Sequence, residues 1–263
     1  MSCDNYIRYL SCGKLGDLIF NLSVINEIFL QSGKKGILFL NEHPEKFQFS
    51  LEKTYNDIKN IILSQKYIQD IKIYDGTSEI DINLNIWRNS PYLSNNNWSV
   101  IYNKTYEKYN IEWGKHIWLD LPKNDKYKEF IFVFHSTRRM NTNISYRNFI
   151  KKTERKVYFI TTDITEYIPF KNVLNCEPLI FDDLYEYCVA LNSCHMMITN
   201  TSFPLCISMG LGRSTIGILP NYPISSIGDT KRGLGLEKIF KNFMWIFDKE
   251  QITSSEILDY IDI

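Results

Sequence analysis

Several sequence patterns that mark common enzyme classes are missing from this chain. It contains no G-x-x-x-x-G-K-[ST] phosphate loop, no G-x-S-x-G nucleophile elbow and no H-E-x-x-H zinc motif. It also has no D-x-D pair of the kind that holds a metal against a nucleotide sugar. The four histidines are far apart along the chain: His43, His116, His135 and His195. We therefore expect no histidine-built metal site and no resident cofactor.

Net charge and long apolar runs are lacking too. Thirty basic residues balance thirty acidic ones, which argues against a general electrostatic grip on nucleic acid or on an anionic membrane. No window approaches the ~20 consecutive apolar residues of a membrane-spanning helix, and the first residues do not form a signal peptide. These features predict a soluble, cytoplasmic protein that binds no nucleic acid and makes at most a peripheral contact with a membrane.

The cysteine pattern points the same way. Six cysteines occur without any C-x-x-C pair, so a zinc cluster has no support from spacing and a reduced compartment is favoured. Cys188, Cys194 and Cys206 fall in or beside expected helices, where a thiol acts as a small hydrophobe. Hydrophobic residues make up 44% of the chain, with 17 Tyr and 16 Phe. This content is enough to build a packed core.

The first forty residues have the pattern of a βαβ unit. Residues 6–10 are aromatic and aliphatic and end at small residues, which predicts a strand. From Asp17 to Gly33 the apolar residues recur at helical spacing, and residues 36–40 form a second apolar run. Two strands joined through a helix pair in parallel, so the chain is expected to begin with a parallel sheet.

The following segment is harder to interpret and ends in an expected linker. The pattern suggests a helix over 55–65, strands over 68–74 and 80–86, a turn at 95–97 and a short helix over 105–111. Residues 121–129, Leu-Pro-Lys-Asn-Asp-Lys-Tyr-Lys-Glu, are polar and contain an early proline. Such composition is typical of a connection between domains.

After this linker the alternation of strands and helices starts again. Strands are expected over 130–134, 157–160, 195–199 and 214–218, and helices over 146–152, 182–192, 203–209 and 253–260. Pro204 fits the first turn of its helix, where a missing N–H costs little. The chain therefore divides into two α/β halves, 1–122 and 123–263. In open sheets of this kind, ligands bind at the carboxyl ends of the strands.

Asp17 is the first candidate for chemistry. It follows the turn Ser11-Cys12-Gly13-Lys14-Leu15-Gly16, between the first expected strand and the first expected helix. A carboxylate there can cap the helix by accepting hydrogen bonds from free amides. It can also face a ligand cleft and act as a general base. Both roles are compatible with the sequence, and neither excludes the other.

Polar groups follow two expected strands of the second half. His135-Ser136-Thr137-Arg138-Arg139 ends one strand, and Asn200-Thr201-Ser202 lies between another strand and its helix. Ser and Thr at such positions often serve only as caps, and paired arginines are often solvated. At strand ends, however, guanidinium groups and free helix amides also suit a diphosphate.

Three stretches carry a resemblance to a known family. They are the turn and helix from Gly13 to Ile28, the strand and turn from Phe132 to Thr137, and the block from Leu184 to Pro220. In order and spacing they resemble the heptosyltransferases, the GT-B glycosyltransferases that include ADP-heptose:lipopolysaccharide heptosyltransferases. The chain departs from the family at Asn200, where aspartate is usual, and at Ser202, where glycine is usual.

The resemblance implies an α/β protein of GT-B fold, with two Rossmann-like domains facing each other across a cleft. Residues 1–122 would form the acceptor-side domain and 123–263 the nucleotide-sugar-binding domain. The C-terminal helix would pack back on the N-terminal domain. The implied reaction is an inverting, metal-independent transfer from a nucleotide sugar to a hydroxyl group of a glycan, a lipid-linked compound or another acceptor. Asp17 would be the catalytic base. The residues implied in donor binding are Lys14, Ser136, Thr137, Arg138, Arg139, Thr162, Asn200, Thr201 and Ser202.

Two other functions fit the same sequence. A GT-B fold could instead catalyse epimerisation or hydrolysis of a nucleotide sugar. The changes at Asn200 and Ser202 would also suit a catalytically degenerate module that binds a carbohydrate or a protein, whereas the retained Asp17 argues for an enzyme.

Overall fold

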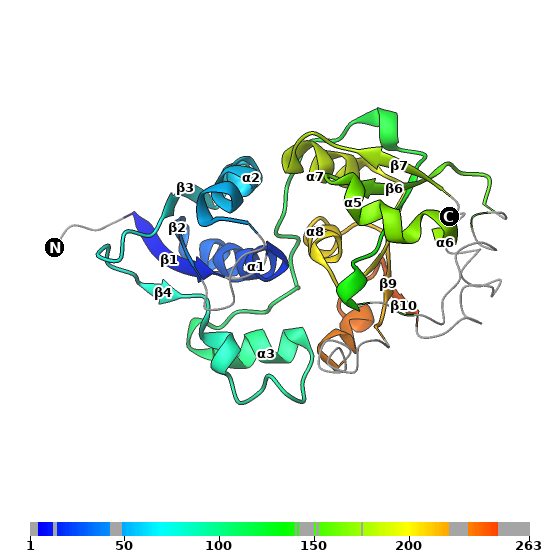
Figure 1. Ribbon diagram of the computed structural model, residues 1–263. Helices are drawn as coiled ribbons and strands as arrows, with labels where there is room; N and C mark the ends of the chain where they lie inside the picture. Colours follow the sequence, from blue (N-terminus) through cyan, green and yellow to red (C-terminus); the bar gives the residue numbers. More distant parts are fainter. Residues whose placement is uncertain are drawn as a thin grey trace. The chain divides into compact units, whose positions relative to one another are not determined.

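The computed structural model describes residues 5–12, 15–42, 49–139, 141, 150, 153–174, 176–220 and 231–246. The chain divides into two compact units, Met1–Leu121 and Pro122–Ile263. We call them the N-terminal unit and the C-terminal unit and describe each by itself (Figure 1).

The N-terminal unit is built on a four-stranded parallel sheet. Its strands have the order β3-β2-β1-β4, and every pair is parallel. The predicted βαβ start is thereby confirmed, since β1 and β2 pair in parallel on either side of α1. The elements are β1 (Tyr6–Cys12), α1 (Leu15–Ser32), β2 (Lys35–Asn41), α2 (Leu51–Leu63), β3 (Ile68–Ile73), β4 (Ile82–Asn83), the 3-10 helix η1 (Ile86–Asn89), α3 (Trp98–Thr105) and the 3-10 helix η2 (Glu107–Tyr109).

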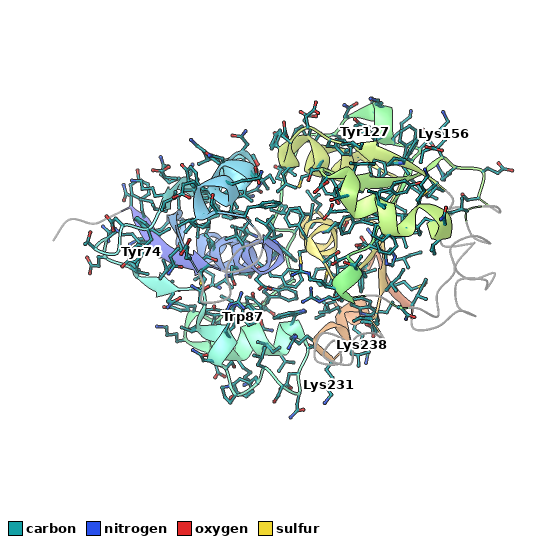
Figure 2. The ribbon with its side chains drawn as sticks, in the orientation of Figure 1. Tyr74, Trp87, Tyr127, Lys156, Lys231 and Lys238 are labelled. Atoms are coloured by element: carbon teal, nitrogen blue, oxygen red, sulfur yellow. The ribbon has the colours of Figure 1, made fainter. Side chains whose placement is uncertain are left out.

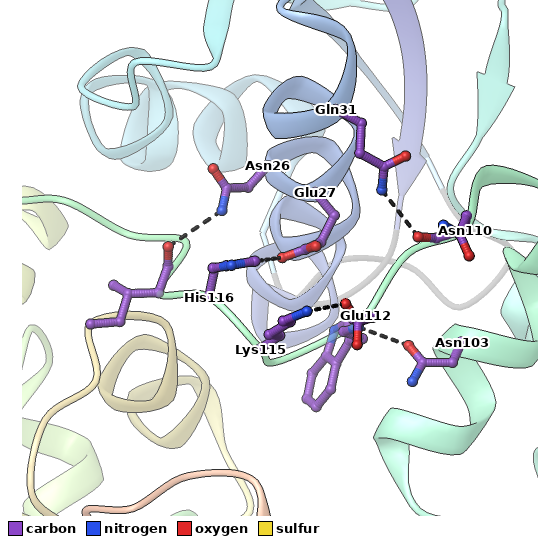
Figure 3. Close-up of polar contacts among 10 residues, drawn as sticks. Asn26, Glu27, Gln31, Asn103, Asn110, Glu112, Lys115 and His116 are labelled. Atoms are coloured by element: carbon purple, nitrogen blue, oxygen red, sulfur yellow. Dashed lines mark hydrogen bonds and ion pairs between the residues drawn. The ribbon is translucent and has the colours of Figure 1, made fainter.

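Helix α1 is buried on all sides over residues 18–28. Some of its buried polar side chains bond to neighbouring elements: the Asn21 amide donates to Ser11 Oγ at 2.9 Å and accepts from the Tyr102 hydroxyl at 2.8 Å. Glu27 is 4% exposed, and its carboxylate lies 2.7 Å from Nδ1 of His116 (Figure 3). Buried polar groups are costly unless they are paired, so these bonds set the position of the helix.

An aromatic cluster joins α1 to the end of the N-terminal unit. The ring of Phe20 makes edge contacts with Trp98, Trp113 and Trp118, at centroid distances of 5.6, 5.1 and 6.3 Å. The indole N–H groups of Trp113 and Trp118 donate to backbone carbonyls of α1. Large rings packed with their N–H groups satisfied hold residues 113–118 against the helix.

Three expectations for the N-terminal unit need correction. The strand expected over 80–86 is only two residues long, and the chain then turns into η1. Of the helix expected over 105–111 only the 3-10 helix η2 is present, and the α-helix of this region, α3, lies earlier, where Asn97 caps it by accepting from the Val100 amide. Helix α1 begins at Leu15, so Asp17 stands inside its first turn and is not the residue that opens it.

The C-terminal unit is built on a six-stranded parallel sheet of order β10-β9-β8-β5-β6-β7. Strand β5 is buried throughout. The strands are β5 (Ile131–Phe134), β6 (Val157–Thr161), β7 (Glu177–Ile180), β8 (Met196–Asn200), β9 (Thr215–Ile218) and β10 (Phe243–Ile246). The helices are η3 (Asp125–Tyr127), η4 (Thr137–Arg139), α5 (Ile164–Tyr167), η5 (Ile168–Phe170), α6 (Lys171–Leu174), α7 (Leu184–Ser193), α8 (Phe203–Gly210) and η7 (Leu236–Lys238).

The expected strands of this unit are present, but sequence reasoning missed two more. Strands β7 and β10 form the two edges of the sheet, and each is only four residues long. Residues 121–129, expected as a linker, span the boundary between the units and include η3. The helices expected over 146–152 and 253–260 fall mostly or wholly outside the described residues.

Each sheet has one topological switch point, which is where chain order reverses across neighbouring strands. In the N-terminal unit it lies between β1 and β4, and in the C-terminal unit between β5 and β8. Open parallel sheets bind ligands just beyond the carboxyl ends of the strands at such points. Each unit thus has one place where a site is expected.

Candidate functional site

Asp17 lies at the switch point of the N-terminal unit. It stands in the first turn of α1, immediately after β1. Its Oδ2 atom accepts a hydrogen bond from Nη2 of Arg88 at 2.6 Å, and both side chains are mostly buried. Oδ1 has no hydrogen-bond partner among the described residues. The carboxylate is therefore held by an arginine and does not cap the helix.

Arg88 reaches this position from the other side of the switch point. It belongs to η1, which follows β4, the strand next to β1. Its guanidinium carbon lies 4.5 Å from the ring centroid of Trp87, which is labelled in Figure 2. Trp87 in turn packs on Trp98 and Tyr102. A cation on an indole face is stabilised electrostatically, and the packed ring gives the arginine a rigid support.

A second bond ties the same two strand ends together. The amide of Cys12, the last residue of β1, donates to Oδ1 of Asn85 at 2.9 Å. Burial raises the pKa of the Cys12 thiol, although the nearby Arg88 charge lowers it and Asp17 raises it further. This thiol stays protonated at neutral pH. The site therefore has one carboxylate and one guanidinium as its charged groups within the described residues.

The switch point of the C-terminal unit carries the predicted donor residues. Residues Ser136 to Arg139 form the turn after β5, where the Arg139 amide donates to the Ser136 carbonyl at 3.2 Å. Thr137 and Arg138 are exposed, and Ser136 and Arg139 are partly exposed. Two guanidinium groups and two hydroxyls thus follow the central strand of the sheet.

Asn200 joins this turn to the neighbouring strand. It is fully buried at the end of β8, and its Oδ1 accepts from the Ser136 amide at 3.1 Å. Its Nδ2 donates to the carbonyls of Ser136 at 2.8 Å and Arg139 at 2.7 Å. These three bonds use both side-chain N–H groups and one lone pair of the side-chain oxygen. Asn200 therefore shapes the turn, and a carboxylate in its place could not donate the two bonds to the carbonyls.

Thr201 and Ser202 lead into α8. Ser202 is the N-cap residue by backbone position, but its hydroxyl contacts Thr199 Oγ1 at 3.2 Å and the Asn200 carbonyl at 3.1 Å and does not cap the helix. The hydroxyl of Thr201 is buried and has no partner among the described residues. The capping interpretation of these hydroxyls is wrong, and Thr201 retains hydrogen-bonding capacity at the switch point.

Thr162 is exposed after β6, the strand on the other side of β5. Close by, Glu166 of α5 accepts a hydrogen bond from Thr161 Oγ1 at 2.5 Å. Burial raises the pKa of Glu166, whereas the Thr161 bond and the Arg138 charge lower it. Arg138 therefore lies near enough to sense this carboxylate, so the ends of β5, β6 and β8 form one polar region.

Of the predicted site residues, Lys14 lies outside the described residues. Sequence reasoning missed Arg88 and Glu166. The rule used for Arg138, a cation just after a strand, would have found Arg88 after the strand expected over 80–86. Its pairing with Asp17, 71 positions away, has no local signal.

His135 provides a test of the packing beneath the turn after β5. It is 5% exposed, and burial lowers its pKa from 6.5 to about 3. Below pH 6.5 the unfolded chain therefore binds a proton that the folded chain does not, and stability falls as pH falls. Well below pH 6.5, the free energy of unfolding should fall by about 1.4 kcal/mol for each pH unit.

We expect the free energy of unfolding of His135→Gln to change less between pH 6.5 and pH 5 than that of the wild type, by about 2 kcal/mol. Urea unfolding at both pH values measures this difference. Equal changes in the two proteins would show that His135 is not held neutral.

Comparison with solved structures identifies this architecture. A glycosyl transferase family 9 structure from Veillonella parvula DSM 2008 matches with a TM-score of 0.61 at 11% identity, over 100% of this chain and 99% of that one. The chain has the GT-B fold. Heptosyltransferase WaaC of E. coli with ADP matches with a TM-score of 0.58 at 10% identity, over 97% of this chain and 99% of that one. ADP-heptose LPS heptosyltransferase II of E. coli gives 0.59 at 9% identity, over 98% and 97%.

No protein-family model matches the sequence, and no curated protein does either. The predicted GT-B fold is nevertheless confirmed, because two parallel α/β sheets with these strand orders match glycosyltransferase structures along the whole chain. Among the described residues, no helix of this GT-B chain is both long enough and apolar enough to cross a membrane.

Proposed function

We propose that this GT-B protein is a glycosyltransferase that moves a sugar from a nucleotide-activated donor to a hydroxyl acceptor. The observation that carries the proposal is the Asp17 carboxylate at the switch point of the N-terminal unit, with Oδ2 held by Arg88 and Oδ1 free of any described partner. A base needs one oriented oxygen that is available to accept a proton. The structural neighbours, two of which are described as complexes with ADP or an ADP-heptose analogue, support a nucleotide sugar as donor.

In the proposed reaction, Oδ1 of Asp17 accepts the proton of the acceptor hydroxyl as that oxygen attacks the anomeric carbon of the donor sugar. The bond from the anomeric carbon to the diphosphate breaks, and the nucleoside diphosphate leaves with the bonding electron pair. Attack opposite to the leaving group inverts the anomeric configuration. Heptose and hexose donors are both compatible with this chemistry.

The negative charge that develops on the diphosphate must be stabilised as the bond breaks. The proposal assigns this task to Arg138 and Arg139, with the hydroxyls of Ser136, Thr137 and Thr201 as further donors and without a metal ion. Thr162 is proposed to contact the nucleoside, and Lys14 and Ser202 to complete the donor site. Asn200 acts through the turn that it shapes, because both of its side-chain N–H groups are already bonded to that turn.

A thermal-shift screen against ADP-, GDP-, UDP- and dTDP-sugars tests whether the ligand is a nucleotide sugar and which nucleobase it carries. We expect one nucleotide series to raise the melting temperature of the wild type. Arg138→Gln should reduce that shift, because it removes a charge from the proposed diphosphate site. Arg155→Gln is the matched control, since Arg155 pairs with Glu129 elsewhere in the C-terminal unit and should leave the shift unchanged.

If no nucleotide sugar raises the melting temperature, the proposal is wrong and a non-enzymatic binding module is favoured. If a donor binds, incubation with and without acceptors separates the remaining reactions. A transferase consumes the donor at a useful rate only with an acceptor, whereas an epimerase or a hydrolase converts it alone.

A further inference from the structure

The ion pair between Asp17 and Arg88 leaves most of the guanidinium group unused. Arginine carries five N–H donors and commonly binds an oxyanion through two of them at once. Here a single bond, from Nη2 to Oδ2 of Asp17, is present among the described residues. The Nε atom is buried and has no described partner. A buried donor without an acceptor is unfavourable, so this arrangement favours binding of a further oxyanion.

Trp87, which packs against the guanidinium, also has a buried N–H group without a described partner. Trp87 is 4% exposed, and its indole N–H also lacks a partner among the described residues. The ring lies against the Arg88 guanidinium and is held by Trp98 and Tyr102. Two adjacent residues thus each have a buried N–H group without a described partner. Aromatic packing fixes the cation before any ligand arrives.

The electrostatic surroundings suit an anion as well. The site lies at the first turn of α1, an 18-residue helix whose amino-terminal end carries partial positive charge. Two titratable groups near Arg88 are the Cys12 thiol and the Tyr106 hydroxyl, and burial raises the pKa of both. Both are therefore neutral near pH 7. Within the described residues, Asp17 is the one anion that competes for the guanidinium.

We propose that Arg88 is an anion-binding residue that exchanges Asp17 for a phosphate or carboxylate group of the ligand, and that this exchange frees the Asp17 carboxylate. For the identity of the ligand the inference rests on the proposed function. The ligand is then the acceptor, which carries an oxyanion close to the hydroxyl that receives the sugar. An acceptor with this group frees Oδ2 of Asp17 by binding, whereas a neutral alcohol leaves Oδ2 bonded to Arg88 and only Oδ1 available.

The test is a titration with inorganic phosphate at constant ionic strength, followed by the NMR signal of the Trp87 indole N–H. The signal is assigned with Trp87→Phe, and it reports on this site separately from any phosphate bound in the C-terminal unit. In the wild type we expect weak, saturable binding. In Asp17→Asn the internal competitor is gone, and the dissociation constant should fall about tenfold.

The variants at Arg88 complete the set. Arg88→Gln should abolish the phosphate-dependent shift, and Arg88→Lys should retain a weaker one, because lysine keeps the charge but loses the planar fork. Glu129→Gln is the matched control: it releases Arg155 from its ion pair and should leave the Trp87 titration unchanged. Equal phosphate affinity in the wild type and in Asp17→Asn, which keeps Arg88, would overturn the proposal even if Arg88→Gln failed to fold.

The source of the anion is resolved by comparing ligands. Glucose 6-phosphate should bind more tightly than inorganic phosphate if the site holds an anionic group of a sugar acceptor, and uncharged glucose should produce no shift. Equal or weaker binding of glucose 6-phosphate would overturn the assignment to the acceptor.

This experiment is independent of the proposed transfer. Phosphate binding at Trp87 without any nucleotide-sugar binding would retain the anion site and remove the transferase. Nucleotide-sugar binding without phosphate binding at Trp87 would retain the transferase and remove the anion site.

Discussion

Asp17→Asn is expected to lower the rate of sugar transfer by about 10²–10⁴-fold, the range found when a general base is removed. Asparagine has nearly the same shape, but its side-chain oxygen cannot take up the proton of the acceptor hydroxyl. The measurement is the initial rate of nucleoside diphosphate release with the donor selected by the thermal-shift screen and a saturating acceptor. The affinity for the nucleotide should not change, because the residues proposed to bind the diphosphate, Ser136 to Arg139 and Thr201, belong to the C-terminal unit.

Asp57→Asn is a suitable control for this variant. Asp57 is also an aspartate of the N-terminal unit in an ion pair, with Lys53 on α2 at 2.9 Å, but that pair is exposed. Exposed pairs of this kind contribute about 0–1 kcal/mol, and transfer should proceed at the wild-type rate. Undiminished transfer by a folded Asp17→Asn protein would show that Asp17 is not the base.

Asn200→Asp is expected to destabilise the C-terminal unit by about 3–5 kcal/mol, the loss typical when a buried charge is left without its partner. The Asn200 amide donates to two carbonyl oxygens, at 2.8 and 2.7 Å, and the residue is fully buried. An ionised carboxylate would lose both bonds and would face those oxygens with like charge. Urea unfolding followed by the fluorescence of Trp245, the tryptophan of this unit, measures the loss.

The effect should weaken as the pH falls, because a protonated carboxyl group can donate one hydrogen bond again. The turn from Ser136 to Arg139 should loosen in the same variant, and nucleotide affinity should fall with it. Asn172→Asp is the control, since Asn172 is exposed on α6 and the same chemical change there should cost little. Equal stability of Asn200→Asp and Asn172→Asp would contradict the bonding of Asn200 described above.

Local sequence patterns were sufficient for much of the fold. Strands β1, β2, β5, β6, β8 and β9 and helices α1, α7 and α8 follow from the period of their apolar residues, because that period depends on backbone geometry alone. Elements with weak periods escaped prediction. Strand β10 and strand β7, which contains Pro178, are short edge strands. Each forms because a neighbouring strand offers free backbone hydrogen-bonding groups, and that strand is separated from it in the sequence.

The candidate site, too, could be predicted from the sequence only in part. That Asp17, Ser136 to Arg139 and Asn200 to Ser202 each follow a strand could be predicted from sequence, because the order of elements along the chain is local information. Which strand ends lie together depends on strand order, and this is set by packing across the whole sheet. Only the tertiary structure therefore decided that β4 pairs with β1 and brings Arg88 to Asp17. It also decided that β8 pairs with β5, so that the Asn200 amide holds the turn from Ser136 to Arg139.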